Sequence, residues 1–153
     1  MATVLVVDDE APIRLLCRVN LEVEGIDVVE ATDGAAAVEA AHRTLPDLIL
    51  LGVMMPNVTG WEAAEQLRQS PVTRDIPIAF LTARGMYRDR LKGLELGAVE
   101  YVTKPFNPLE LPHLVRELLA LGPDGRQERR RQKLDEVRLL VEQDPDGPSD
   151  GAR

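Results

Sequence analysis

Residues 4–10, VLVVDDE, decide the fold: four consecutive apolar residues run directly into three acidic ones. A short apolar run without alternation predicts a strand that is buried on both faces, which is typical of a parallel sheet. Similar runs occupy residues 48–51, 76–81 and 99–102, and a weaker run at residues 27–30 fits a peripheral strand. The sequence therefore predicts the five strands of one buried parallel sheet.

Helical patterns lie between and after these runs. One of them, at residues 35–41, is rich in alanine, a strong helix former, and in the others apolar residues recur at helical spacing. The periodic positions are Ile13, Leu16 and Cys17; Trp61, Ala64 and Leu67; Leu91 and Leu94; and Leu111, Leu114, Val115 and Leu118. Repeated β-α units imply right-handed crossovers, which place helices on both faces of the sheet. The predicted class is therefore α/β and doubly wound.

The chain has 153 residues, enough for one domain of ordinary size with some residues to spare. Hydrophobic residues make up 44% and charged residues 29%, which predicts a folded globule. We expect the main domain at residues 1–121 and a linker at GPDG, residues 122–125. One more helix is predicted at residues 126–143, followed by a disordered tail at residues 144–153.

Acidic residues outnumber basic ones by 26 to 18, which leaves a net charge of -8. Nucleic acid and anionic membrane surfaces repel a net anion, so neither is an expected partner. No apolar run approaches the ~20 residues that span a bilayer, and a cytoplasmic location is therefore expected. The single cysteine, Cys17, fits a small core residue, whereas His42 and His113 are expected at the surface.

The predicted C-terminal helix is strongly charged. Residues 126–138 contain six basic and three acidic side chains. Such a run forms either a solvated helix face or an element that docks on a partner or on nucleic acid. Leu134, Val137 and Val141 make a narrow apolar stripe that is too short for a coiled coil alone. This stripe is expected to pack on the preceding domain or to pair with a partner helix.

Polar residues follow the predicted strands. Asp8 and Asp9 follow the first strand, Thr82 the fourth and Lys104 the fifth, whereas Gly52 follows the third. In open α/β sheets, ligands bind beyond the carboxyl ends of the strands. Adjacent carboxylates beside a lysine and a hydroxyl indicate a site for a hard divalent cation and a phosphoryl group. Taken alone, the two acids also fit helix-capping residues.

Four motifs, VLVVDDE, PDLILLGVMMPNVTGWE, PIAFLTA and GAVEYVTKPF, closely resemble, in order and spacing, the receiver domain of two-component response regulators. The resemblance covers about residues 3–121. It implies a flavodoxin-like five-stranded parallel sheet of order 2-1-3-4-5 with five helices, to which the helix at residues 126–143 would be an extension.

The resemblance also implies roles for individual residues. One group would hold Mg²⁺ in an acid pocket, and another would sense the phosphoryl group. The first group comprises Asp8, Asp9 and the backbone carbonyl of Met54, and the second comprises Thr82, Lys104 and the switch residue Tyr101. The Lys104–Pro105 bond is typically cis in this family, which a proline permits at modest free energy.

Gly52 departs from the family pattern. The family has an aspartate at this position, which accepts the phosphoryl group and ligates the metal, and glycine has no side chain for either task. Asp47 lies at the start of the same strand, about 16 Å away, too far to replace it. Mg²⁺ binding is thus expected to be weak or absent, and Lys104 is expected to pair with Asp8 or Asp9. Either the chain is a natural degenerate receiver, or Gly52 replaces the aspartate of an ordinary one.

We therefore expect a stand-alone receiver that is not an enzyme and acts through protein contacts. Its expected partner is a histidine kinase, a phosphotransfer protein, a downstream target or a second copy of the chain, bound through the face around residues 86–119. An ordinary Mg²⁺-dependent phosphoacceptor carrying a Gly52 substitution is the alternative. A dehalogenase-like phosphatase is less consistent, because the acids at Asp8 and Asp9 are adjacent rather than spaced as DxD. An anion sensor using the space beside Lys104 and Thr82 is opposed by the same two carboxylates.

Overall fold

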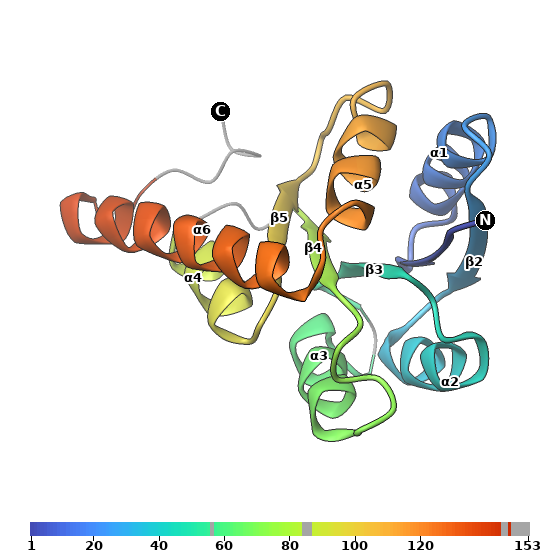
Figure 1. Ribbon diagram of the computed structural model, residues 1–153, viewed down its shortest axis with the longest axis horizontal. Coiled ribbons are helices and arrows are strands. Elements are labelled where there is room, and N and C mark those ends of the chain that lie inside the picture. The colour runs from blue at the N-terminus through green and yellow to red at the C-terminus, as the bar shows by residue number, and fades with distance from the viewer. Residues whose placement is uncertain (56, 84–86, 145–146, 148–153) are drawn as a thin grey trace.

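The computed structural model describes residues 1–55, 57–83, 87–144 and 147, and its ribbon is shown in Figure 1. Five parallel strands form one sheet of order β2-β1-β3-β4-β5, which confirms the predicted class and topology. The strands are β1 (Thr3–Val7), β2 (Asp27–Ala31), β3 (Leu48–Gly52), β4 (Ile78–Thr82) and β5 (Glu100–Thr103). The helices are α1 (Ala11–Glu22), α2 (Gly34–Thr44), α3 (Gly60–Gln69), α4 (Tyr87–Glu95), α5 (Leu111–Leu119) and α6 (Pro123–Gln143).

The central strand β1 explains why the apolar runs are continuous. It pairs with β2 on one side and with β3 on the other, and its residues from Val4 to Val7 are fully buried. Val4 and Val6 pack in the core under α1 and α5, whereas Leu5 and Val7 face the core under α2 and α3. Successive side chains of a strand point to opposite faces, so a strand between two helical layers needs apolar residues at every position.

Helix α6 differs from the prediction at its start. The linker expected at residues 122–125 is mostly helical, because Pro123 opens the helix and only Gly122 precedes it as the N-cap residue. Proline suits a first helical position, since its fixed φ matches the helix and its missing N–H would be unbonded there anyway. Of the predicted tail, residues 145–146 and 148–153 lie outside the described part of the chain.

The apolar stripe of α6 packs against α4. Leu134 and Val137 are buried against Leu94, and the partly buried side chains Tyr87, Leu91 and Val141 surround them. Figure 1 shows α6 running beside α4 at the edge of the sheet near β5. Of the two placements left open by the sequence, packing on the preceding domain is therefore the one that the structure adopts.

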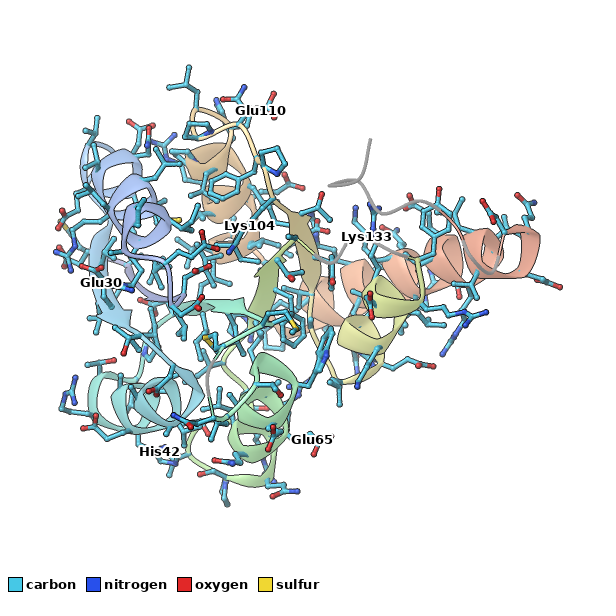
Figure 2. All side chains as sticks on the ribbon, turned by 180° about the vertical axis from the view of Figure 1, so that it is seen from behind. Glu30, His42, Glu65, Lys104, Glu110 and Lys133 are labelled. Carbon is cyan, nitrogen blue, oxygen red and sulfur yellow. The ribbon has the colours of Figure 1, made fainter. Side chains whose placement is uncertain are left out.

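Basic side chains of α6 bind the preceding domain around this apolar contact with α4. Arg129 Nη2 lies 2.6 Å from Glu100 Oε2 on β5, and Arg129 also pairs with Glu117 on α5. Lys133, labelled in Figure 2, lies 3.6 Å from the same Glu100 oxygen, and Arg138 lies 3.7 Å from Glu95 on α4. The charged run is thus neither a wholly solvated face nor a free docking element. It holds α6 against β5, α4 and α5.

Helix α6 covers part of the predicted partner face, which was expected around residues 86–119. It packs on α4 and binds Glu100 and Glu117. Residue 86 lies outside the described residues. A second copy could use the whole face only after α6 had moved away. Among the described helices, none combines the length and apolar character needed to cross a membrane.

Shortening an apolar side chain between α6 and α4 should loosen α6 without loosening the sheet. We expect Leu134→Ala to weaken the docking of α6 by about 2 kcal/mol, because the variant loses buried apolar contacts with α4. Hydrogen exchange should speed up across residues 123–143 while β1 and β3 keep their protection. Leu139→Ala is the matched control, because Leu139 lies on the same helix and is 55% exposed. Equal effects of the two variants would contradict the proposed packing role.

Candidate functional site

The site lies at the edge of the sheet where the strands end. Asp8 follows β1, Gly52 ends β3, Thr82 ends β4 and Lys104 follows β5. In a parallel sheet all carboxyl ends meet at one edge, so residues separated by more than 90 positions become neighbours. The structure brings Asp8 and Lys104 together as the sequence predicted, and Figure 2 shows Lys104 near the middle of the molecule.

Asp8 is the most enclosed charged group of the site. Its side chain is 1% exposed, and the Glu10 backbone N–H donates to Asp8 Oδ1 at 2.9 Å. Asp8 Oδ2 lies 2.7 Å from Lys104 Nζ, an ion pair whose orientation is poor for a hydrogen bond. Because a buried carboxylate is strongly destabilising without a cation, Lys104 and Asp8 depend on each other.

Lys104 contacts two carboxylates at once. Besides Asp8, its ammonium donates a hydrogen bond to Glu10 Oε1 at 3.3 Å. Burial by itself lowers the pKa of Lys104, but the attraction of the Asp8 and Glu10 carboxylates outweighs burial and raises the pKa above its ordinary value. The ammonium is therefore held in its charged form. The second partner is Glu10 rather than the expected alternative, Asp9.

Three carboxylates form a compact group beside this ammonium. One carboxylate oxygen from each of Asp8, Asp9 and Glu10 lies within 4.8 Å of the other two. Oxygen donors at this spacing fit a hard cation such as Mg²⁺, which binds through one or two carboxylates and keeps several waters. Glu10 was missed as a site residue, although it continues the run Asp8–Asp9 and could have been noticed for that reason.

Gly52 lies directly beside Asp8. A Cβ atom at Gly52 would lie 3.0 Å from the Val7 carbonyl oxygen and 3.4 Å from Asp8 Oδ2. A side chain at this position would therefore project toward the acid group and would need a shift of a few tenths of an ångström. The backbone at Gly60 also lies very close to the end of β3: a Cβ at Gly60 would lie 2.0 Å from the Gly52 carbonyl oxygen. Only glycine at position 60 allows α3 to start against the end of β3.

The other predicted site residues lie around this pocket. Thr82 is buried at the end of β4, where it pairs in register with Thr103, and its carbonyl accepts from the Lys104 N–H at 2.8 Å. The Tyr101 ring lies 6.3 Å from the Phe80 ring and packs against the core. The Met54 side chain is 59% exposed. The Lys104–Pro105 bond is cis, as the resemblance implied.

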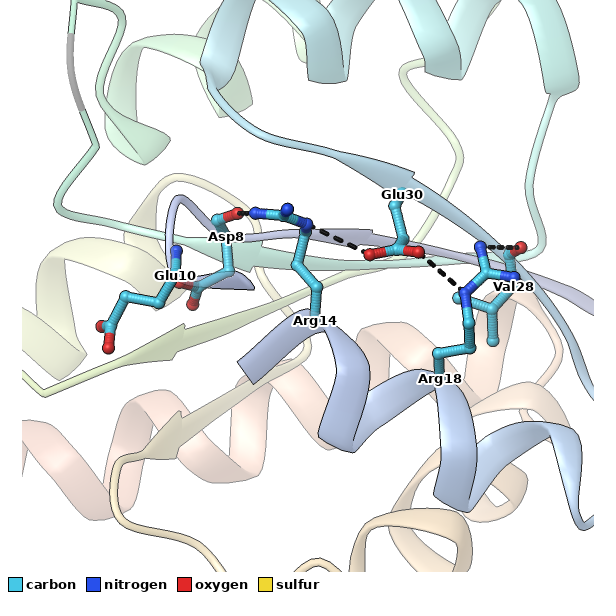
Figure 3. A network of polar contacts seen from close by, with 6 residues as sticks. All are labelled: Asp8, Glu10, Arg14, Arg18, Val28 and Glu30. Atoms are coloured by element: carbon cyan, nitrogen blue, oxygen red, sulfur yellow. Dashed lines mark hydrogen bonds and ion pairs between the residues drawn. The ribbon is translucent and has the colours of Figure 1, made fainter. Parts of the chain in front are cut away.

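A network of arginines supports the turn that carries Asp8 (Figure 3). Arg14 Nη1 donates to the Asp8 carbonyl oxygen at 2.8 Å, and Arg14 Nε binds Glu30 at 3.1 Å. Arg18 Nε binds the other Glu30 oxygen at 2.7 Å, and Arg18 Nη2 donates to the Val28 carbonyl at 3.2 Å. This network ties α1 to the end of β1 and to β2. Sequence reasoning missed it, because no local pattern pairs Glu30 with Arg14 and Arg18.

Residues predicted to lie outside the site do so. Cys17 is fully buried, and burial, followed by the nearby Asp8 charge, raises the pKa of its thiol to about 12. His42 is exposed, with its ring hydrogen-bonded to the Val38 carbonyl and the Ser70 hydroxyl, and His113 is exposed on α5. None of these three residues contributes to the carboxylate group.

Comparisons with known proteins match the main domain. The chain is 46% identical over 116 residues to the phosphate regulon transcriptional regulatory protein PhoB of Escherichia coli (strain K12), covering 76% of this chain and 51% of the relative. It is 47% identical to the alkaline phosphatase synthesis transcriptional regulatory protein PhoP of Bacillus subtilis (strain 168), with coverage of 76% and 48%. The chain thus spans about half the length of these curated relatives.

Solved structures agree with the fold. Chemotaxis protein CheY4 of Vibrio cholerae matches with a TM-score of 0.73 and 33% identity, covering 77% of this chain and 98% of that one. A response regulator described as putative from Chloroflexus aurantiacus J-10-fl matches with a TM-score of 0.74 and 34% identity, covering 78% and 98%. Residues 4–116 match the family model of the response regulator receiver domain, and the whole of α6 lies beyond them. The chain therefore belongs to the response regulator receiver domain family.

Proposed function

We propose that this receiver acts in two-component signalling through protein contacts and accepts no phosphoryl group at position 52. The observation that carries the proposal is the pairing of Lys104 with Asp8 and Glu10 beside a glycine. In the family to which the chain belongs, an aspartate at this position would be the phosphoacceptor. Here Gly52 offers no nucleophile, and the ammonium that would meet the phosphoryl group neutralises the acid group instead.

The remaining carboxylates support weak Mg²⁺ binding. Asp8, Asp9 and Glu10 supply the oxygen donors, and the Met54 backbone carbonyl is a further ligand by family resemblance. When bound, Mg²⁺ would neutralise negative charge on the acid group and on a phosphoryl group. Two features reduce its affinity: position 52 adds no carboxylate, and the Lys104 ammonium already lies 2.7 Å from Asp8.

The proposed partners are a histidine kinase, a phosphotransfer protein, a downstream target or a second copy. The charge of the chain favours a protein over nucleic acid or a membrane, because both of these repel a net charge of -8. Partner contacts over residues 86–119 would compete with α6, which already binds Glu100 and Glu117 there.

A second candidate function follows because, apart from position 52, the pocket has the residues of a phosphoacceptor site. Asp8, Asp9, Thr82 and Lys104 are all in place at the strand ends, as in an ordinary Mg²⁺-dependent phosphoacceptor. If Gly52 replaces the aspartate of such a protein, the pocket should regain its chemistry when the carboxylate is restored. An aspartate here would attack the phosphorus of a donor and form an acyl phosphate, while the donor leaves with the bonding electron pair.

The two candidates share one experiment. With acetyl phosphate and Mg²⁺, the chain with Gly52 should remain unlabelled, whereas Gly52→Asp should gain an acid-stable, alkali-labile phosphoryl group. Gly52→Ala is the control, because it introduces the same Cβ beside Val7 without a carboxylate. Rapid labelling of the chain with Gly52 would contradict the first proposal. A folded Gly52→Asp variant that stays unlabelled would contradict the second.

The ion pair predicts how stability depends on pH. Because the folded-state pKa of Lys104 is raised, its contribution is fully present below the unfolded-state pKa near 10.5 and is lost as pH rises through the folded-state value. Lys104→Met should lower the free energy of unfolding at neutral pH by about 3 kcal/mol, because Asp8 remains buried without its cation. The gap to the natural chain should narrow as pH rises above that value.

Denaturant unfolding from pH 7 to about 12 measures this dependence, because the folded-state pKa of Lys104 lies above 10.5. Lys92→Met is the control, because Lys92 contacts the Trp61 ring rather than a carboxylate. A stability difference between Lys104→Met and the natural chain that persists unchanged through alkaline pH would contradict the assigned ion pair.

A further inference from the structure

A hollow lies at the opposite end of the sheet from the acid group. It has a volume of about 440 Å³ and lies where β4 and β5 begin, between the receiver body and the first turns of α6. Ile76, Pro77 and Val99 supply apolar walls. Arg68 of α3 and Arg126 and Arg130 of α6 also line it. A volume of this size falls in the range of small-molecule sites, roughly 300–1,000 Å³.

The three arginines bind neutral groups only. Arg68 donates to the carbonyls of Arg74, Leu96 and Gly97, Arg130 to those of Leu94 and Glu95, and Arg126 to that of Leu121. A guanidinium has five N–H donors, so each arginine keeps some of them for another partner. Across residues 1–55, 57–83, 87–144 and 147, no carboxylate forms an ion pair with any of the three.

The positive charges of these arginines lie close together at this hollow. Burial and then the charge of Arg130 lower the pKa of Arg68 from its ordinary value. Backbone carbonyls hold Arg68 in place, and Gly97, where φ is +105°, leaves room for its guanidinium, because a Cβ there would lie 1.8 Å from Arg68 Nη2. Two exposed carboxylates, Asp75 and Asp124, also line the hollow, and the Asp75 charge partly offsets the lowering of the Arg68 pKa. Neither carboxylate forms an ion pair with the three arginines, so the described lining keeps more positive than negative side chains.

We propose that this hollow binds a nucleotide, with its phosphate groups on Arg68, Arg126 and Arg130. Guanidinium groups match phosphate oxygens in geometry and charge, and they bind them bidentately. Ile76, Pro77 and Val99 would contact the less polar part of the ligand. Since one arginine comes from the receiver body and two from α6, the bound nucleotide would also hold α6 in its docked position. This site is independent of Gly52 and of the function proposed above.

ADP in EDTA-containing buffer tests the site without metal at the carboxylates. ADP should shift the backbone amide resonances around Gly97 and Arg126 and slow hydrogen exchange in α6, whereas adenosine should do neither. Arg126→Gln and Arg130→Gln should each weaken ADP binding about tenfold or more, because each removes one charged phosphate ligand. Arg131→Gln is the matched control, because Arg131 lies on the same helix and pairs with Glu128 and Asp135.

Circular dichroism establishes that each variant is folded, and Arg126→Gln is the milder change because its side chain makes a single bond to the receiver body. Absence of any ADP-induced change at millimolar concentration would overturn the proposal. So would equal weakening by Arg131→Gln, which would indicate general charge attraction. Pyrophosphate binding as tight as that of ADP would overturn the assignment to a nucleotide. Labelling of position 52 has no bearing on any of these outcomes.

Discussion

The parallel arrangement of five buried strands is the constraint on which the rest of the molecule depends. The central strands β1 and β3 satisfy their backbone groups by pairing on both sides, and helices cover both of their faces. All carboxyl ends then lie at one edge of the sheet. Polar residues that cannot enter the apolar core gather there, which places Asp8 and Lys104 side by side without any local signal that links them.

At that edge, one ammonium balances the charge of a buried carboxylate. Asp8 is too enclosed to remain charged alone, and the pocket supplies Lys104 as its partner. With Gly52 adding no further negative charge, one ammonium shared by Asp8 and Glu10 is enough to neutralise the buried acid. A side chain at position 52 would start beside an existing acid, because a Cβ there would lie 3.4 Å from Asp8 Oδ2.

Helix α6 shows how a charged segment becomes part of a folded body. Its apolar seam is small, and Leu134 and Val137 alone are buried among its residues. Glu100 on β5 accepts both Arg129 and Lys133, and Arg130 donates to carbonyls at the end of α4. These long-range pairs act together with the apolar stripe of α6, which packs on α4. They also leave Arg126 and Arg130 beside Arg68, where positive charge is concentrated in a net acidic chain.

The fold class, the order of the elements and the residues at the strand ends could all be predicted from the sequence. This was possible because buried strands, helical spacing and turn residues are local patterns with local physical causes. The ends of elements were predicted less accurately, as with α6, which starts at Pro123 rather than at residue 126. Three contacts became visible only in the folded chain: Lys104 pairs with Glu10 as well as Asp8, Arg14 supports the Asp8 turn, and α6 covers α4 and Glu100. These contacts join residues far apart in the chain. They depend on which side chains the folded chain brings close together and buries, and local sequence patterns do not show this.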